Sequence, residues 1–543
     1  MSQYNTILSK LEPDTLYGFF VGGCGSFGMN MTAYIINQKL YLVDVGLAFA
    51  DDYEIGIDSY IPDIEPLIDH FKNVEAYFIT HGHEDHVGAL PLFLEKYPAP
   101  VYATGWTLKI LEDRIQKFGS RVSPETFLVQ PGDRIKKNEL TVDWIHVPHS
   151  IPGCCSLHIQ AANSKVFHTG DFKFDMNPPY EPSPDTAFLK SIAPVSAFIS
   201  DSTNSTKDGL CPSESSVGPN LEKCFRKHPN GLIVFTTFSS NFWRLKTVLK
   251  VCESVGRKVL ISGISLRKTL DIALSMGYEV NHENIVDESQ AKHIARDKLL
   301  VIASGSQGEP RSGLRRIIFG EHRHVTLEKG DCIVMSSRVI PGNEKPLARL
   351  MSQAHKNGIL IENHSSSPGI HVSGHAHSGD LLALMDLIKP HVHIPVHGTF
   401  TQLVANGSLH TKALPVENGS LIRFSEANAE LVTHLKIDKL FIDSWSQRPM
   451  SYETMRSRHK IGDSGLCIIT GTSNEVDVEL IGMPFDDDND VESCKIFVQG
   501  SVEKGKELHP NKEDFNEWLR LAVRRHLSKR FVKKPVVISK IIL

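Results

Sequence analysis

The sequence contains no long apolar run and few cysteines. No run approaches the roughly 18 apolar residues of a membrane-spanning helix, so we expect no membrane partner. The first residues lack a basic segment followed by a long apolar stretch, which predicts a cytoplasmic protein without a secretory signal. The 9 cysteines are scattered, odd in number and never spaced as C-x-x-C, a pattern that favours reduced thiols over a disulfide framework.

A strong excess of either charge is also missing. The chain has 58 Lys and Arg against 63 Asp and Glu, a formal net charge of −5. No global basic surface therefore indicates nucleic-acid binding, and any basic surface must be local. With 41% hydrophobic and 22% charged residues, the composition is that of a soluble globular protein. A length of 543 residues predicts about three domains.

Short apolar runs alternate with Gly-, Pro- and Asp-containing turns in the first part of the chain. Residues 40–45, 76–80 and 165–168 have the pattern of buried strands. Each run ends at polar residues of the type that carry chemistry. We therefore expect an α/β sandwich with a functional site at the edge of its sheets.

From about residue 212 the alternation changes character. Residues 232–237 and 258–261 are predicted to be parallel strands, and residues 241–252 and 266–275 are predicted to be helices. Metal-type motifs stop here and resume only near His371. This interruption indicates a domain inserted into another domain.

The last part of the chain changes composition again. Residues 439–460 are predicted to be a connector, followed by a small α+β domain with an amphipathic helix at 513–527 and a strand at 536–543. Residues 520–534 are rich in Lys and Arg and contain no acid. A solvated helix face is the preferred interpretation of this tract, with an RNA contact as the alternative.

A compact cluster of metal-ligand residues follows the predicted strand at 76–80. His81, His83, Asp85 and His86 lie within six residues, and imidazole and carboxylate ligands suit borderline divalent metals. A lone H-x-H pair is usually a pair of surface histidines, but four ligand-type residues directly after an apolar strand are a strong signal. His81 and His83 can share one metal, and Asp85 and His86 face a second.

Partners for this cluster occur further along the chain. His149 lies in a Pro-containing loop, Asp171 follows a predicted strand, and His397 ends another apolar run. A carboxylate between two metals can bridge them, and a bridged pair roughly 3.5–4 Å apart activates a shared water and clamps a displacement at phosphorus. His375 lies in a Gly-rich turn that a substrate can approach closely. The neighbouring residues His377, His391 and His393 are interpreted as packing or solvent-facing histidines.

Longer strings identify a family. Residues 169–175 (TGDFKFD), 200–204 (SDSTN), 305–310 (GSQGEP), 340–344 (IPGNE) and 371–375 (HVSGH) resemble ribonuclease J, in the β-CASP branch of the metallo-β-lactamase superfamily. The resemblance covers nearly the whole chain. It implies a metallo-β-lactamase αββα sandwich with an inserted β-CASP domain and a small α+β C-terminal domain. The implied boundaries are residues 1–207 and 372–437 for the sandwich, 208–371 for the β-CASP domain, 438–460 for a linker and 461–543 for the C-terminal domain.

The resemblance also implies a role for each motif residue. One metal would be held by His81, His83, His149 and Asp171, and the other by Asp85, His86, Asp171 and His397. Asp201 matches the family's proton donor, and His375 matches its general-base partner. The residues that match the substrate pocket are Ser239, Ser240, Asn241, His371, Val372, Ser373, Gly374 and His375. Arg244 and Lys268 of the inserted domain are further expected RNA contacts.

The activity implied is hydrolysis of single-stranded RNA by a homodimer or higher homo-oligomer that combines 5′-to-3′ exonuclease and endonuclease action. The His/Asp ligands favour Zn²⁺, two per chain, with Mn²⁺ as the alternative. Two other functions stay open, a β-CASP nuclease acting on DNA and a non-catalytic RNA-binding scaffold. The complete ligand set argues against the scaffold.

Three positions depart from the family pattern. Ser26 replaces an acidic residue of the first Gly-rich loop, and Thr399 and Phe400 replace the Glu-Tyr pair of the family after His397. Residues 444–448 (SWSQR) stand in place of a Gly-rich connector. We expect these changes to affect the tuning of the site, the substrate preference and the oligomer contacts rather than catalysis itself.

Overall fold

The computed structural model describes residues 3–50, 54, 56–340, 342–483, 488–509, 511–530 and 534–542. The chain forms two compact units. The first comprises Met1–Ala48 and Ile61–Lys439, and the second comprises Phe49–Tyr60 and Leu440–Leu543. Within the described residues, no helix is both long enough and apolar enough to cross a bilayer.

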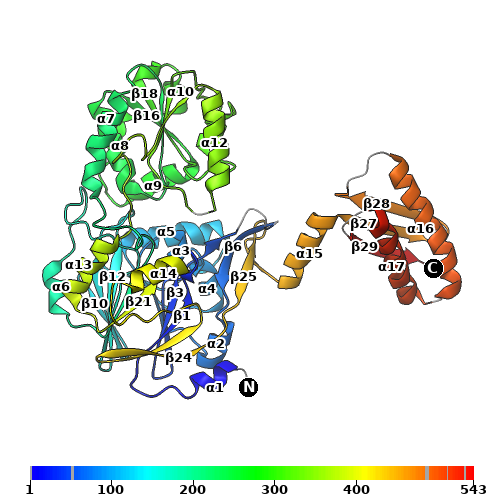
Figure 1. Cartoon of the computed structure of the whole chain (residues 1–543), viewed down its shortest axis with the longest axis horizontal. Coiled ribbons are helices and arrows are strands. Elements are labelled where there is room, and N and C mark those ends of the chain that lie inside the picture. The colour runs from blue at the N-terminus through cyan, green and yellow to red at the C-terminus, as the bar shows by residue number, and fades with distance from the viewer. Residues whose placement is uncertain are drawn as a thin grey trace. The chain divides into compact units, whose positions relative to one another are not determined.

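Two mixed sheets form a sandwich in the first unit. The first sheet has the order β24 (Asn428–His434), β23 (Ser420–Ser425), β1 (Tyr17–Gly22), β3 (Met31–Ile36), β4 (Lys39–Val43), β7 (Ala76–Phe78), β8 (Val101–Ala103) and β9 (Thr126–Leu128). The second has the order β10 (Arg134–Lys137), β11 (Leu140–His146), β12 (Cys155–Ala161), β13 (Ser164–His168), β14 (Ala197–Asp201) and β21 (Val392–Val396). Strands from the two ends of this unit lie side by side, with β1 beside β23 (Figure 1).

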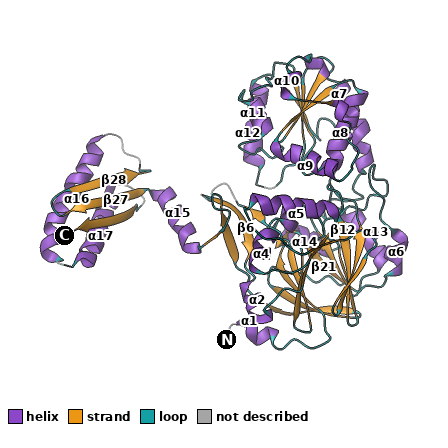
Figure 2. Ribbon diagram, turned by 180° about the vertical axis from the view of Figure 1, so that it is seen from behind, coloured by secondary structure: helices purple, strands orange, loops and turns teal. Residues whose placement is uncertain are grey.

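The core of the sandwich lies between the two sheets. Phe78 and Tyr34 of the first sheet pack in one buried cluster with Trp144 and Ile199 of the second. Strands β1 and β3 are buried along their whole length, as expected for strands covered on both faces. Helices surround the two sheets (Figure 2). They are α1 (Gln3–Leu8), α2 (Glu65–Phe71), α3 (Glu84–Val87), α4 (Leu90–Lys96), α5 (Gly105–Lys117), α6 (Thr186–Ser191), α13 (Ser378–Ile388) and α14 (Phe400–Gly407).

Parallel pairing determines where the functional loops lie. Strands β4, β7 and β8 are parallel neighbours in the first sheet, and β13, β14 and β21 are parallel neighbours in the second. The carboxyl ends of parallel strands meet at one edge of a sheet, so the loops that follow them converge. Asp44 and His397 stand directly after such strands with positive φ angles of 59° and 54°. Non-glycine residues adopt this conformation rarely, and often at functional sites.

The inserted domain is a doubly wound α/β fold. Its parallel sheet has the order β17 (Ile285–Val286), β16 (Lys258–Ser262), β18 (Leu299–Ala303), β15 (Ile233–Thr236), β19 (Cys332–Met335) and β20 (Leu360–Glu362). Its helices are α7 (Val217–Arg226), α8 (Phe242–Ser254), α9 (Ile264–Ser275), α10 (Glu288–Ala291), α11 (Gly313–Ile318) and α12 (Glu344–Lys356). Apolar clusters cover both faces of this sheet. The parallel strands and the helices expected in this region are confirmed.

The second unit contains the C-terminal α+β fold. Its three-stranded sheet has the order β28 (Val476–Ile481), β27 (Leu466–Thr472) and β29 (Val536–Ile542), and α16 (Asp488–Leu508) and α17 (Lys512–Arg530) pack on it through one apolar cluster. The expected helix at 513–527 is confirmed, and so is the closing strand as far as Ile542, since Leu543 lies outside the described residues. Residues 531–533 of the basic tract also lie outside them.

The segment expected to be a connector is regular structure instead. It contains β25 (Lys439–Asp443), β26 (Pro449–Met450) and the start of α15 (Tyr452–Ser464). These strands form a sheet in the order β26, β25, β6 (Ile57–Pro62) and β5 (Ala48–Phe49). Because the partner strands come from the opposite end of the chain, no local pattern in the sequence predicts this pairing.

Candidate metal centre and substrate loops

Asp44 fixes the loop that carries the histidine cluster. It is 2% exposed, and its carboxylate accepts hydrogen bonds from Thr80 N at 2.8 Å and Thr80 Oγ1 at 2.8 Å. His86 Nδ1 lies 2.7 Å from Asp44 Oδ2, so this ring nitrogen donates. The ring turns Nε2 toward Asp171 Oδ1, 3.1 Å away, where a metal would take the place of the Nε2 proton. The sequence marked Asp44 only as a polar strand end, and its positioning role becomes visible in the folded chain.

Four donor atoms of the first expected ligand set converge. His83 Nδ1 lies 3.1 Å from His81 Nε2 and 3.2 Å from His149 Nε2. Asp171 Oδ2 lies 3.6 Å from His81 Nε2 and 3.7 Å from His149 Nε2. Ligand atoms about 2.0–2.1 Å from one tetrahedral metal lie roughly 3.3 Å apart, so this spacing fits a shared divalent cation.

The second expected ligand set has the same spacing. His397 Nε2 lies 3.1 Å from Asp85 Oδ2 and 3.5 Å from Asp171 Oδ1. His86 Nε2 lies 3.1 Å from Asp171 Oδ1 and 3.7 Å from Asp85 Oδ2. Asp171 thus turns one oxygen to each set, the arrangement of a bridging carboxylate. The structure brings all seven expected ligands together in two groups that share Asp171.

Three other expected ligands, His81, His149 and His397, also have hydrogen-bond partners at the ring nitrogen that would not bind a metal. His81 Nδ1 lies 3.0 Å from Thr80 Oγ1, and His397 Nδ1 lies 2.7 Å from Thr203 Oγ1. His149 Nδ1 donates to the carbonyl oxygen of Gly374 at 2.6 Å. Such bonds fix the tautomer and aim the other nitrogen at a metal. The Gly374 contact also ties the Gly-rich substrate loop directly to a ligand.

The two ligand sets differ electrostatically. Burial lowers the pKa of His83 to about 4 and the pKa of His149 to about 3, which leaves both rings neutral. Burial acts in the same direction on His86, but the carboxylates of Asp171 and Asp44 outweigh it and raise the pKa of His86 well above its usual value. The first set is therefore rich in neutral imidazole, and the second is rich in carboxylate.

Asp201 and His375 form a hydrogen-bonded pair beside both sets. His375 Nδ1 lies 2.8 Å from Asp201 Oδ2, and His397 Nδ1 lies 3.1 Å from Asp201 Oδ1. Asp201 is 1% exposed, whereas the side chain of His375 is 23% exposed. Burial opposes ionisation of Asp201, but His375 and His397 hold its pKa below the usual range. The exposed member of the pair is the one that can reach a substrate.

The loop 371–375 divides into a buried and an accessible part. His371 is 6% exposed, and its Nδ1 lies 3.1 Å from the carbonyl oxygen of Ser336. Val372 is 5% exposed. Ser373 Oγ accepts hydrogen bonds from Asn204 Nδ2 at 2.6 Å and from His375 N at 3.1 Å. His371 and Val372 therefore anchor the loop, and Ser373 and Gly374 line a cavity.

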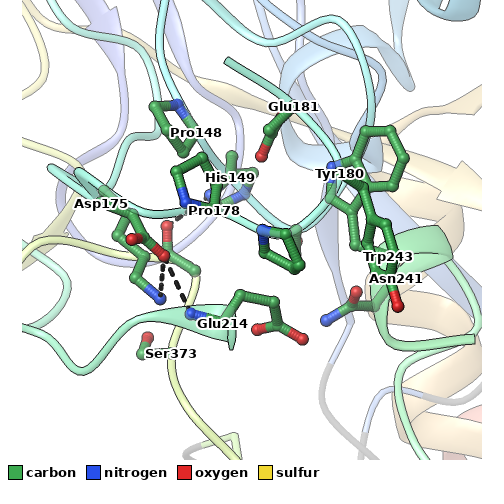
Figure 3. A pocket seen from close by; sticks show the side chains of 14 residues that line it. Pro148, His149, Asp175, Pro178, Tyr180, Glu181, Glu214, Asn241, Trp243 and Ser373 are labelled. Carbon is green, nitrogen blue, oxygen red and sulfur yellow. Dashed lines mark hydrogen bonds and ion pairs between the residues drawn. The ribbon is translucent and has the colours of Figure 1, made fainter. Parts of the chain in front are cut away.

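That cavity lies against His149 (Figure 3). Its volume is about 10 Å³, which is room for a single water molecule. Lys173 Nζ lies 3.4 Å from Asp175 Oδ2 in its wall, and burial raises the pKa of Glu181 well above its usual range. The wall thus carries an ion pair and an acid that burial keeps protonated, with little net positive charge.

The three residues of the expected phosphate loop do not share one cavity. Asn241 lines the cavity beside His149, and its Oδ1 accepts a hydrogen bond from Arg244 N at 2.9 Å as the cap of α8. Ser239 Oγ accepts a hydrogen bond from Ser265 Oγ at 2.9 Å and lines a separate cavity of about 460 Å³ in the inserted domain. Ser240 lies between them in the turn before α8.

The expectation that Arg244 contacts RNA is wrong. Its side chain is fully buried, and its guanidinium donates two hydrogen bonds to Glu214, at 2.6 and 2.8 Å. It also donates to Ser336 Oγ at 2.5 Å and to the carbonyl oxygen of Val372 at 3.2 Å. Arg244 therefore holds the loop 371–375 in place. Lys268 is 47% exposed but forms an ion pair with Asp113 at 2.5 Å.

Two of the family departures lie next to one another. Strand β2 (Cys24–Gly25) pairs in parallel with β22 (Gly398–Thr399), and Gly25 is the register partner of Thr399. Ser26 and Phe400 follow these partners in the chain. Ser26 and Thr399, the two positions where the resemblance implies an acidic residue, are thus neighbours at the rim of the second ligand set, where the Phe27 ring centroid lies 6.2 Å from that of His397.

Several residues that build the site escaped the sequence analysis. Glu214, which pairs with Arg244, is one of them. The others are Asn30, Thr203, Asn204 and Ser336. Each acts by hydrogen bonding to a motif residue: Asn30 Nδ2, for example, donates to Asp85 Oδ2 at 3.1 Å. Thr203 and Asn204 lie within the quoted string at 200–204, which was the one available signal.

Two family models match the chain. The model for the metallo-beta-lactamase superfamily matches residues 28–204, and the model for the ribonuclease J beta-CASP domain matches residues 230–354. The ribonuclease J of Sinorhizobium meliloti is 33% identical over 95% of this chain and 95% of its own. Those of Mycolicibacterium smegmatis and Thermus thermophilus are 32% and 31% identical, over 85% and 84% of this chain and 84% and 82% of their own.

A solved structure supports the fold alone. A protein of unknown function from Enterococcus faecalis superposes with a TM-score of 0.56 at 17% sequence identity. The match covers 75% of this chain and 100% of the other.

Proposed function

The chain belongs to the ribonuclease J family, and from that premise we propose that this metal-dependent ribonuclease cleaves single-stranded RNA both from the 5′ end and internally. The observation that carries the proposal is the convergence of seven ligands in two groups that share Asp171. The hydrogen-bonded pair of Asp201 and His375 lies beside them. Such a constellation fits hydrolysis at phosphorus better than binding alone.

The proposed cofactor is a pair of divalent cations per chain. His81, His83 and His149 would hold one cation, and Asp85, His86 and His397 would hold the other, with Asp171 bridging. The His/Asp donor set favours Zn²⁺, and Mn²⁺ is the alternative. When bound, the cations supply Lewis acidity toward the phosphoryl oxygens and activate the attacking water.

His375 is the proposed proton carrier. Its Nδ1 is held by Asp201 at 2.8 Å, which leaves Nε2 as the ring nitrogen free to face the reacting groups. As water adds to phosphorus it gives up a proton, and the bond to the ribose oxygen breaks. The imidazole delivers its proton to the departing oxygen and is recharged by the proton that the water released. In this proposal Asp201, which matches the family's proton donor, stays ionised, since His375 and His397 outweigh burial and hold its pKa below the usual range. It therefore orients the ring and compensates its positive charge.

The RNA is proposed to lie between the inserted domain and the sandwich. Asn241 of the inserted domain and Ser373 and Gly374 of the loop 371–375 line the same cavity beside His149. An amide, a hydroxyl and Gly-rich backbone can donate hydrogen bonds to phosphate oxygens without a fixed charge. Because this cavity has room for only one water molecule, a 5′ phosphate would have to widen it. A 5′ end anchored here would favour trimming, whereas a strand that bypasses the anchor would be cut internally.

The proposal is tested with matched oligonucleotides. Enzyme loaded with Zn²⁺ or Mn²⁺ is incubated with 5′-monophosphorylated RNA, 5′-triphosphorylated RNA and DNA of the same sequence, and the products are resolved by length. We expect single nucleotides from the monophosphorylated RNA and longer internal fragments from the triphosphorylated RNA. Faster cleavage of DNA would favour the DNA nuclease, and binding without cleavage under every metal condition would favour the scaffold.

The assembly proposed is a cytoplasmic homodimer or higher homo-oligomer, with the C-terminal domain contributing to assembly rather than to chemistry. Every expected site residue precedes Gly398 in the chain. Truncation near Lys460 should therefore reduce the particle mass in sedimentation and lower activity only indirectly. A truncated protein that keeps its mass but loses all turnover would overturn this assignment.

A further inference from the structure

An extended RNA needs cations beyond the metals, and the cations expected from the sequence are already paired. Arg244 is buried against Glu214, and Lys268 is bound to Asp113. The cavity beside His149 holds little net positive charge. Single-stranded nucleic acid, however, carries one negative charge per nucleotide, and proteins hold it mainly through Lys and Arg contacts to phosphate.

Lys207 lies beside the loop 371–375. Its backbone is fixed, because Lys207 N donates to the carbonyl oxygen of Asn204 at 2.9 Å and Ser378 N donates to the carbonyl oxygen of Lys207 at 3.0 Å. Its ammonium donates to Asn204 Oδ1, and Asn204 Nδ2 in turn donates to Ser373 Oγ. One amide side chain therefore links the Lys207 ammonium to the hydroxyl expected to meet the substrate.

Arg338 of the inserted domain lies two residues after Ser336, whose Oγ donates to the carbonyl oxygen of Ile370, directly before the same loop, at 2.6 Å. It follows β19, and its carbonyl oxygen accepts a hydrogen bond from Gln307 Nε2 at 2.8 Å. Gln307 Oε1 accepts a hydrogen bond from Ile340 N at 2.7 Å, so one side chain holds both sides of the Arg338 turn. Arg338 and Lys207 are both partly buried. In the part of the chain that the structure describes, no carboxylate forms an ion pair with either of them.

The two cations are close enough to affect each other and the loop. Burial and the charge of Arg338 lower the pKa of Lys207 to about 8. Burial, Lys207 and Arg338 lower the pKa of His377 to about 4, and Arg338 also contributes to the depressed pKa of His371. Lys207 and Arg338 thus place two like charges near residues 371–377, and neither forms an ion pair with a carboxylate among the described residues. This costs stability unless a ligand supplies the anion.

We propose that Lys207 and Arg338 form a cationic subsite for the RNA backbone, in which they bind phosphate oxygens of the nucleotides next to the scissile bond. The inference rests on the proposed function, since it takes RNA to be the polyanion that enters the site. Phosphates carry no base identity, so the subsite holds and orients the strand without reading its sequence. Lys207 reaches the strand from the sandwich and Arg338 from the inserted domain, so one strand links the two domains.

The test is the salt dependence of RNA binding by the full-length, metal-loaded protein. Binding of single-stranded phosphorothioate RNA, which resists cleavage, is measured across a salt series for the wild type, Lys207→Met, Arg338→Met and the double variant. The logarithm of the binding constant falls linearly with the logarithm of the salt concentration. For a single strand, each lost phosphate contact reduces the magnitude of this negative slope by about 0.7. We expect that decrease for each single variant, about twice that decrease for the double variant, and a wild-type slope for Lys207→Arg.

The matched control is Lys250→Met, which removes an exposed lysine of α8 in the inserted domain. Its slope should equal that of the wild type. Weaker binding of Lys207→Met at an unchanged slope would mean that Lys207 acts only through Asn204 and Ser373, and would overturn the inference. An equal loss of slope in the control would do so as well.

A failure of the proposed function is recognised separately. If the wild type binds RNA with the expected slopes but cleaves none, the nuclease assignment fails and the subsite stands. If the wild type cleaves RNA while the Lys207 and Arg338 variants keep the wild-type slope, the subsite fails and the nuclease assignment stands.

Discussion

The sandwich and the inserted domain both place polar loops at the ends of parallel strands, but the loops carry different types of side chain. In both, polar loops follow the carboxyl ends of parallel strands. At the sandwich edge these loops bury carboxylates and imidazoles, such as Asp44, Asp171 and Asp201, which are at most 3% exposed. At the edge of the inserted sheet the loops carry hydroxyl and amide groups, and the buried cation Arg244 is neutralised by Glu214. In the proposed function, the first edge holds the metals and the second positions a strand of RNA.

The largest effect is expected from Asp171→Asn in the sandwich. Asp171 offers one oxygen to each ligand set, so an amide there weakens both sites at once. We expect loss of detectable RNA cleavage and of both metal equivalents, measured by metal analysis of protein prepared without chelator. If the wild-type protein were fully active with one metal equivalent per chain or with none, the two-metal arrangement would be contradicted.

His375→Ala should separate proton transfer from metal binding. His375 belongs to neither ligand set but is held by Asp201. Loss of a positioned general acid or base costs typically 10²–10⁴-fold in rate, so we expect a decrease of about that size in kcat. Metal content should remain at the wild-type level. Loss of a metal would instead make His375 a ligand, in the third group that it forms with Asp171, Asp201 and His397.

Arg244→Met tests whether the inserted domain holds the substrate loop. Removing one partner of a buried ion pair typically costs about 3–5 kcal/mol, and here it also frees the carbonyl oxygen of Val372. We expect a lower free energy of unfolding and a raised KM for RNA. The matched control is Arg226→Met, which breaks the exposed pair with Glu222 on α7 and should cost about 0.3–0.5 kcal/mol. Equal costs for the two variants would contradict the buried role of Arg244.

The smallest effect is expected from the double variant Ser240→Ala, Asn241→Ala. If these residues anchor the 5′ end, trimming from that end should fall by about tenfold, the value of one or two lost hydrogen bonds. Internal cleavage should be largely retained, because an unanchored strand does not use the pocket. Products from end-labelled and internally labelled RNA separate the two activities. Equal losses would place these residues at the scissile bond or in the fold.

Much of the site could be predicted because its signals are local. His81, His83, Asp85 and His86 follow one apolar strand, and Asp171 and His397 follow others, so pattern alone placed them at one sheet edge. The strands and helices of the inserted domain were predicted from the same periodicity. The strand β25 was missed because it pairs with residues near the start of the chain. Arg244 was misjudged because its partner Glu214 lies in a different element. A sequence does not show whether a charged side chain is exposed or buried in an ion pair.

The sequence by itself determined which residue types are present at the strand ends, and with them the family and the class of chemistry. Only the tertiary structure decided how each group is used. It gave the two oxygens of Asp171 to different ligand sets and buried Arg244. It also linked Lys207 to Ser373, 166 positions further along the sequence, through the side chain of Asn204. The physical reason is that ligand geometry, burial and charge pairing depend on distances in space. Those distances are fixed by strand pairing and core packing between segments remote in the chain.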